Sequence, residues 1–199
     1  PAKCVCKLPD DISFETGAAM MLKGLTVQYL INDTYAVQKG DTVLLHAAAG
    51  GVGTIACQWL KALGATVIGT VGSPEKAELA KAHGCDHTIL YREEDFVARV
   101  REITGGKGVP VVYDSIGKDT FMKSLDCLSP RGLMVTFGNA SGPVPPLDVS
   151  ILAGKGSLKV TRPTLTTYVL NRALLEPMAA DLFQRVISGQ VKIEINQRY

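Results

Sequence analysis

A chain of 199 residues that is 46% hydrophobic and 20% charged has the balance of a soluble globular protein with one domain or a domain and a half. Its 21 basic and 19 acidic side chains leave a net charge of +2, which excludes the strong field expected of a protein that binds nucleic acid or a membrane surface. It has no apolar run of membrane-spanning length, and its five cysteines without a CxxC pair indicate reduced thiols in the cytoplasm.

The N-terminal segment is predicted to lead into helices. Residues 1–9 are bounded by proline, as in the exit from a preceding domain, and Cys4 and Cys6 would share one face of a strand there. Half of a metal site is one interpretation of these thiols, but no second Cys/His pair follows at zinc spacing, so ordinary strand residues are favoured. Ser13 is a predicted N-cap, with Thr16 three residues on, and a second helix is predicted over residues 22–35.

From residue 42 onward, apolar β-rich runs alternate with helical stretches. The predicted strands are 42–46, 66–70, 87–90, 109–113, 133–137 and 158–161, and the predicted helices lie near 53–63, 74–83, 95–104 and 119–128. This alternation implies parallel pairing with right-handed crossovers. We therefore predict an α/β fold, a Rossmann doubly wound parallel sheet of six strands in the order 3-2-1-4-5-6.

The C-terminal segment has no place in that sheet. A helix is predicted over 167–188, and residues 191–195 alternate like a strand. We expect residues 1–24 to be the end of a catalytic domain and its connecting helix, 25–164 the dinucleotide-binding domain, and 165–199 an incomplete return toward the catalytic domain. A start at Pro1 without Met, and a stop just after an apparent strand, are expected of a fragment.

The sharpest motif joins the first strand to the first helix at residues 47–53, AAAGGVG. Ala48 replaces the first glycine of the G-x-G-x-x-G pattern, and the other two are kept. Strand-to-helix turns often carry glycine for steric reasons alone, but this position in a βαβ unit favours a dinucleotide, because backbone N–H groups and the positive helix end attract its pyrophosphate. The predicted contacts are Ala49, Gly50, Gly51, Val52 and Gly53.

The end of the second strand indicates NADPH rather than NADH. An acidic residue usually binds the ribose 2′-hydroxyl there, and residues 69–73, GTVGS, contain none. Gly72 would let the ribose approach, Ser73 would donate its hydroxyl, and Lys76 would supply positive charge for a 2′-phosphate. Lys76 could instead be a solvated helix residue, and Glu75 could be a displaced ribose ligand.

Four stretches together carry a family resemblance: residues 47–53, 91–95 (YREED), 112–117 (VYDSIG) and 161–163 (TRP). The chain resembles, over essentially its whole length, the quinone oxidoreductases, the zeta-crystallin-like, zinc-free branch of the medium-chain dehydrogenase/reductase superfamily. The resemblance implies an adenine contact at Tyr91 and a place for Arg162 near the domain junction. It implies a nicotinamide site at Thr26, Phe137, Gly138 and Asn139. Surface, core or turn roles are the alternatives for these loop residues.

A catalytic acid or base is not assigned. His46, His83 and His87 are interpreted as structural, and a set of zinc ligands is absent from the sequence. A quinone accepts electrons readily, so orientation in a dry cleft suffices. Asp114 and Ser115 are the polar pair of interest, and shaping the loop after the fourth strand is their expected role.

The resulting hypothesis is an NADPH-dependent quinone reductase acting on a small-molecule quinone. The alternatives are a zinc-free enoyl reductase of the same superfamily and a non-catalytic NADPH-binding sensor or structural protein. The resemblance also implies a homodimer formed through the sixth strand, since residues 158–161 are the exposed edge in the predicted order.

Overall fold

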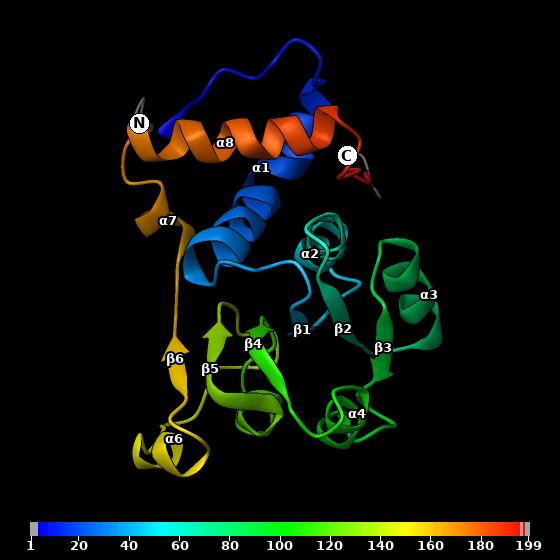
Figure 1. Ribbon diagram of the computed structural model, residues 1–199. Helices are drawn as coiled ribbons and strands as arrows, with labels where there is room; N and C mark the ends of the chain where they lie inside the picture. Colours follow the sequence, from blue (N-terminus) through cyan, green and yellow to red (C-terminus); the bar gives the residue numbers. More distant parts are fainter. Residues whose placement is uncertain (1–3, 196, 198–199) are drawn as a thin grey trace.

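The computed structural model describes residues 4–195 and 197, and its centre is one parallel sheet (Figure 1). The strand order is β3-β2-β1-β4-β5-β6, which confirms the predicted order 3-2-1-4-5-6. Pairing of β1 with β2 runs from Thr42 opposite Thr66 to Leu45 opposite Gly69. The strands are β1 (Thr42–Leu45), β2 (Thr66–Val71), β3 (His87–Leu90), β4 (Val109–Asp114), β5 (Leu128–Thr136) and β6 (Lys159–Thr161).

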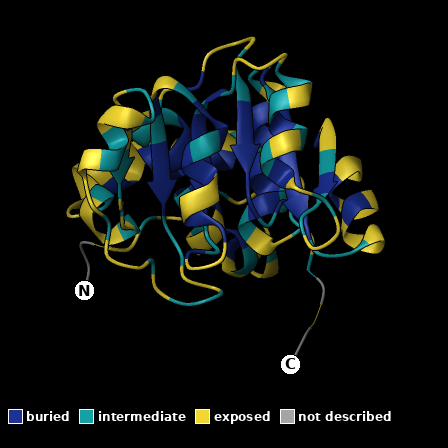
Figure 2. Cartoon of the chain, turned by 90° about the horizontal axis from the view of Figure 1, so that it is seen from below, coloured by how far each residue is buried: buried dark blue, intermediate teal, exposed yellow. Residues whose placement is uncertain are grey.

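Helices cover both faces of the sheet, and this explains the continuous apolar strand runs. Val43 and Leu45 face a cluster shared with α1 and α2, whereas Leu44 between them faces a second cluster shared with α4. Figure 2 shows the strands buried between helices whose outer turns are exposed. The helices are α1 (Phe14–Tyr29), α2 (Gly51–Ala62), α3 (Pro74–Ala82), α4 (Phe96–Ile103), α5 (Phe121–Ser124), α6 (Ser150–Gly154), α7 (Leu165–Tyr168) and α8 (Arg172–Ile187).

The N-terminal region differs from the prediction of two helices. Ser13 caps α1, as predicted, by accepting a hydrogen bond from the Thr16 backbone N–H at 3.1 Å. The chain then continues as one helix to Tyr29 and passes into a π-helical segment, η2 (Leu30–Thr34). The two helices merge because backbone hydrogen bonding continues across the expected boundary at residue 22. Residues 5–9 are irregular, so the two N-terminal cysteines do not lie on a strand.

The predicted helix over residues 167–188 is in fact two helices. The side chain of Asn171 accepts a hydrogen bond from the Leu174 backbone N–H at 3.1 Å and starts α8 anew. Figure 1 shows α8 crossing α1, and a Cβ at Gly24 would lie only 2.6 Å from the Leu182 side chain at this crossing. The glycine therefore lets the two flanking helices pack closely. Both helices contribute to the same core cluster as α2.

The predicted strand over residues 191–195 is wrong. This segment is irregular, and the backbone of Lys192 pairs with a side chain instead of a strand. The Gln58 amide donates to the Lys192 carbonyl at 3.1 Å and accepts from its N–H at 2.8 Å. The alternating pattern thus places side chains along a tail that lies beside α2.

None of the helices described is both long and apolar enough to serve as a membrane span.

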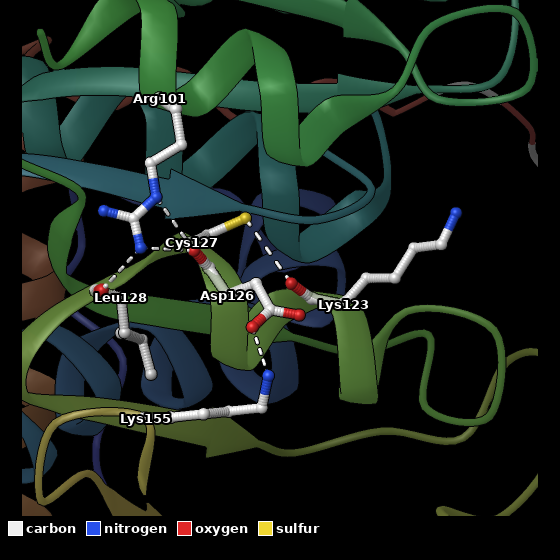
Figure 3. Close-up of polar contacts among 6 residues, drawn as sticks. All are labelled: Arg101, Lys123, Asp126, Cys127, Leu128 and Lys155. Atoms are coloured by element: carbon white, nitrogen blue, oxygen red, sulfur yellow. Dashed lines mark hydrogen bonds and ion pairs between the residues drawn. The ribbon is translucent and has the colours of Figure 1, made fainter. Parts of the chain in front are cut away.

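The predicted helix over residues 119–128 is also shorter than expected, and β5 starts earlier. α5 gives way to a 3-10 turn, η3 (Leu125–Cys127), and Leu128 already pairs with Val109 of β4. Arg101 of α4 fixes this turn at the amino ends of the two strands (Figure 3). Its guanidinium donates to the carbonyl of Asp126 at 2.6 and 3.0 Å and to that of Leu128 at 3.3 Å. These Arg101 contacts lie at the amino ends of the strands, whereas the Gly-rich loop lies at their carboxyl ends.

Candidate functional site

The Gly-rich loop leaves the carboxyl end of β1 and turns tightly into α2. Ala47 adopts a left-handed conformation with φ 55°, and its carbonyl accepts a hydrogen bond from the Gly50 N–H at 2.8 Å. A Cβ at Gly53 would lie 2.5 Å from the Ala48 carbonyl oxygen, so only glycine permits this approach of helix to loop. The first turn of α2, Gly51–Val52–Gly53, carries no charged side chain. Its backbone N–H groups therefore present the positive helix end to an anion.

A cleft of about 310 Å³ opens beside this loop at the carboxyl ends of β1, β2 and β4. In open α/β sheets, this edge is where ligands bind. The predicted contacts Ala49, Gly50, Gly72, Ser73, Lys76 and Tyr91 all line the cleft. Its remaining lining residues are Ala47, Val71, Arg92 and Ile116.

Two cations, Lys76 and Arg92, line the cleft, and sequence reasoning found only Lys76. Arg92 lies with its Cζ 5.8 Å from the centre of the Tyr91 ring, and its Nε would be 3.8 Å from a Cβ at Gly72. Lys76 comes from the first turn of α3, where its N–H donates to the Ser73 hydroxyl oxygen at 3.4 Å. The signal for Arg92 was its place directly after Tyr91, in the loop that follows the third strand.

The alternative ligand Glu75 lies elsewhere. Glu75 lines a separate surface hollow with Glu78 and Lys81, and it does not line the cleft. The Ser73 hydroxyl beside Glu75 lowers the pKa of that carboxyl, so it stays ionised. A carboxylate on this outer face does not compete with Lys76 and Arg92 for the inside of the cleft.

Arg162, predicted near the domain junction, contacts two of the predicted nicotinamide residues, Gly138 and Asn139, which do not line the cleft. Arg162, at the end of β6, donates through Nη1 to the Gly138 carbonyl at 3.1 Å and to Asn139 Oδ1 at 3.0 Å. Phe137 packs against the larger core cluster. The Thr26 hydroxyl donates to the Leu22 carbonyl within its own helix at 2.8 Å. Arg162 therefore fixes the loop after β5, and Asn139 and Arg162 line a hollow distinct from the cleft.

Two further residues shape the site. Lys23 of α1 reaches the start of α2, where its Nζ would be 3.0 Å from a Cβ at Gly51, and the sequence offered no signal for it. Asp114 holds the loop after β4, because its carboxylate accepts from the Ile116 N–H at 2.7 Å and from the Thr120 hydroxyl at 2.9 Å.

Within residues 4–195 and 197, His, Cys, Asp and Glu side chains form no group of three that could hold a metal ion.

Six parallel strands in this order, with a Gly-rich loop between β1 and α2, define a Rossmann dinucleotide-binding domain. The profile of the family described as zinc-binding dehydrogenase matches residues 51–179. The chain therefore belongs to this family, within the medium-chain dehydrogenase/reductase superfamily.

Individual relatives give a finer picture. The chain is 59% identical over 192 residues to a quinone oxidoreductase of Pseudomonas aeruginosa, covering 96% of this chain and 59% of that protein. It is 53% identical over 192 residues to a 2-haloacrylate reductase of a Burkholderia species, covering 95% and 58%. The structure of Escherichia coli quinone oxidoreductase complexed with NADPH superposes with a TM-score of 0.93 at 55% identity, covering 96% and 58%. The chain thus spans about three-fifths of the length of these relatives.

Proposed function

We propose that this chain is the NADPH-binding portion of a quinone reductase, which transfers a hydride or electrons from NADPH to a small-molecule quinone. The observation that carries the proposal is the pair of cations, Lys76 and Arg92, in one cleft with the Gly-rich loop. Relatives named quinone oxidoreductase, at 59% and 54% identity, support the substrate class.

The residues present fit NADPH in one orientation. The pyrophosphate would meet the N–H groups of residues 49–53, and the ribose would lie over Gly72, where a side chain would fill the space. The 2′-phosphate would lie between Ser73, Lys76 and Arg92, with the adenine against Tyr91. Thr26, Phe137, Gly138 and Asn139 would line the nicotinamide side, and Arg162 would lie near the domain junction. When bound, NADPH supplies the hydride, and the chain's residues orient it and exclude water.

Calorimetric titration with NADPH and NADH tests the cofactor. We expect the wild-type chain to prefer NADPH, and Lys76→Ala and Arg92→Ala each to weaken NADPH binding roughly tenfold or more, because each removes a charge-assisted hydrogen bond of about 1.5–3 kcal/mol. NADH binding should change little. Lys81→Ala is the matched control, since Lys81 is on the same helix and pairs with Glu78 outside the cleft. Equal wild-type affinity for both nucleotides would contradict the proposal.

The relative named 2-haloacrylate reductase favours a second candidate, reduction of an activated carbon–carbon double bond. Oxidation of NADPH, followed at its near-ultraviolet absorbance with 1,4-benzoquinone or 2-chloroacrylate as acceptor, separates the two. Quinone-dependent oxidation supports the first candidate, and oxidation with 2-chloroacrylate alone supports the second. Tight NADPH binding by the full-length protein, without oxidation by either acceptor, would instead indicate a sensor or structural protein.

We also propose that two copies pair through β6. This three-residue strand pairs with β5 on one side, and its other side is the edge of the sheet. An open edge is a site for pairing with another chain. Sedimentation equilibrium should give a dimer, and a monomer at micromolar concentration would refute this.

A cytoplasmic location fits the five free thiols, since a reducing compartment keeps thiols reduced.

A further inference from the structure

His46 occupies the junction between β1 and the Gly-rich loop. It is 1% exposed, and its backbone N–H donates to the Tyr113 carbonyl at 2.9 Å. The next residue, Ala47, is the one with the left-handed backbone that begins the loop. The conformation of the loop therefore starts from a residue whose side chain lies entirely inside the protein.

Both ring nitrogens of His46 have a hydroxyl partner. Nδ1 lies 2.8 Å from Thr70 Oγ1, and Nε2 lies 2.8 Å from Ser124 Oγ. The ring packs nearly perpendicular to that of Phe96, with ring centres 5.1 Å apart. The side chain thus joins β2 on one side to α5 on the other, across the end of β1.

The partners of Ser124 assign the tautomer. Its hydroxyl has one hydrogen, and it donates that hydrogen to the Thr120 carbonyl at 2.8 Å, because a carbonyl can only accept. Ser124 Oγ must therefore accept from His46, so the ring proton is on Nε2. Nδ1 is left as the acceptor for the Thr70 hydroxyl. Complete burial lowers the pKa of His46 and keeps the ring neutral, although the charge of Asp114 opposes this shift.

The same hydrogen-bond chain reaches three segments that line the cleft, which are the Gly-rich loop, the end of β2 and the loop after β4. Thr70 accepts the Ala48 N–H of the loop through its carbonyl at 3.1 Å, and it is followed directly by the cleft residues Val71 and Gly72. At the other end, the Thr120 hydroxyl donates to the Asp114 carboxylate, which holds the loop after β4. The His46 side chain links the two halves of this hydrogen-bond chain, through Thr70 on one side and Ser124 on the other.

We propose that His46, as the neutral Nε2–H tautomer, is a positioning residue that holds the Gly-rich loop, the end of β2 and the loop after β4 in the geometry that binds the dinucleotide. This inference rests on the proposed function. A positioning residue for the shared part of the nucleotide acts equally on NADPH and NADH, whereas Lys76 and Arg92 act on the 2′-phosphate. If loss of His46 reduces the binding-competent fraction to about one-tenth, Kd for both nucleotides rises about tenfold.

The test measures Kd for NADPH and NADH with four variants of the full chain. His46→Phe keeps a ring but removes both hydrogen bonds, Thr70→Val removes the partner of Nδ1, and Ser124→Ala removes the partner of Nε2. His87→Gln is the control, because His87 is exposed at the start of β3. In parallel, a long-range proton–nitrogen NMR spectrum of the wild type reads the tautomer, and the His46 signals are those lost in His46→Phe.

We expect the first three variants to raise both Kd values by similar factors without changing their ratio, and the wild-type spectrum to show the proton on Nε2. Unchanged Kd values in a folded variant, or a proton on Nδ1, would overturn the inference. If His46→Phe does not fold, the two hydroxyl variants and the spectrum decide. Equal wild-type affinity for both nucleotides would refute only the NADPH preference, and a wild type that binds neither would overturn both proposals.

Discussion

Gly53→Ala is the most direct perturbation of the Gly-rich loop. The new Cβ would lie 2.5 Å from the Ala48 carbonyl oxygen and nearer still to that of Ala47. Both atoms belong to the backbone, so the contact cannot be relieved by a side-chain rotation. Reaching an ordinary contact requires the loop to move away from α2 by about 1 Å, and overpacking of this kind costs about 1–3 kcal/mol of unfolding free energy.

The displacement should affect binding more than it affects folding. The N–H groups that would meet the pyrophosphate belong to the moved segment, and a misplacement of about 1 Å can cost on the order of a hundredfold. We expect calorimetry to show a loss of tenfold to a hundredfold in affinity for NADPH and NADH alike, as orders of magnitude. Urea denaturation would measure the stability change on the same samples.

Gly154→Ala is the control for the added methyl group. A Cβ there meets nothing within 4 Å, and the residue is the last of α6, far from the loop in sequence. Its affinity should match the wild type, and its stability should equal or slightly exceed it, because alanine loses less conformational entropy on folding than glycine does. A folded Gly53→Ala protein with wild-type affinity would refute the reasoning, because it would mean that the loop binds without its observed geometry.

Three further results are expected. Arg101→Met should lower the unfolding free energy by about 1–3 kcal/mol in urea denaturation, because the partly buried carbonyls of Asp126 and Leu128 lose their donor. It should leave NADPH affinity unchanged, and a weakened affinity would contradict the place of Arg101 at the amino ends of the strands. Cys4 is exposed and should react with a colorimetric thiol reagent at neutral pH. Cys127 should react only after denaturation, because it is buried and burial raises its pKa to about 12. Rapid modification of both thiols in the folded protein would be inconsistent with the structure. Because burial lowers the pKa of His46, the unfolded chain binds a proton that the folded chain does not, so stability should fall by up to about 1.4 kcal/mol per unit as pH drops below about 6.5. That slope should be smaller in His46→Phe, and an identical slope in both proteins would exclude His46 as its source.

Local pattern was enough for much of the fold. Strand-like apolar runs separated by helical stretches predicted all six strands and their order, because parallel connections allow few arrangements. The Gly-rich loop and the helix ends at Gly64 and Gly84, which have φ values of 81° and 94°, were predictable for the same reason. Gly64 and Gly84 adopt a backbone conformation that few residues other than glycine adopt, and Gly53 allows a close approach of helix to loop that a Cβ would block.

Helix and strand boundaries at the ends of the chain depended on distant contacts. Residues 191–195 alternate like a strand, but the backbone there pairs with the Gln58 side chain, and no local pattern encodes that partner. Asn171 interrupts the predicted long helix because its side chain caps a new one. In both places a polar side chain satisfied backbone groups that the pattern had assigned to regular structure.

By itself, the sequence determined the fold class, the position of the Gly-rich loop and the absence of an acid at the end of β2. Only the tertiary structure decided which side chains meet there. Arg92 enters the cleft because β3 lies beside β2, and Lys23 reaches the loop because α1 packs on α2. The tautomer of His46 follows from hydroxyls 24 and 78 residues away in the chain. Side-chain chemistry can be read along the chain, but the partner of a buried polar group is set by the packing of elements distant in sequence.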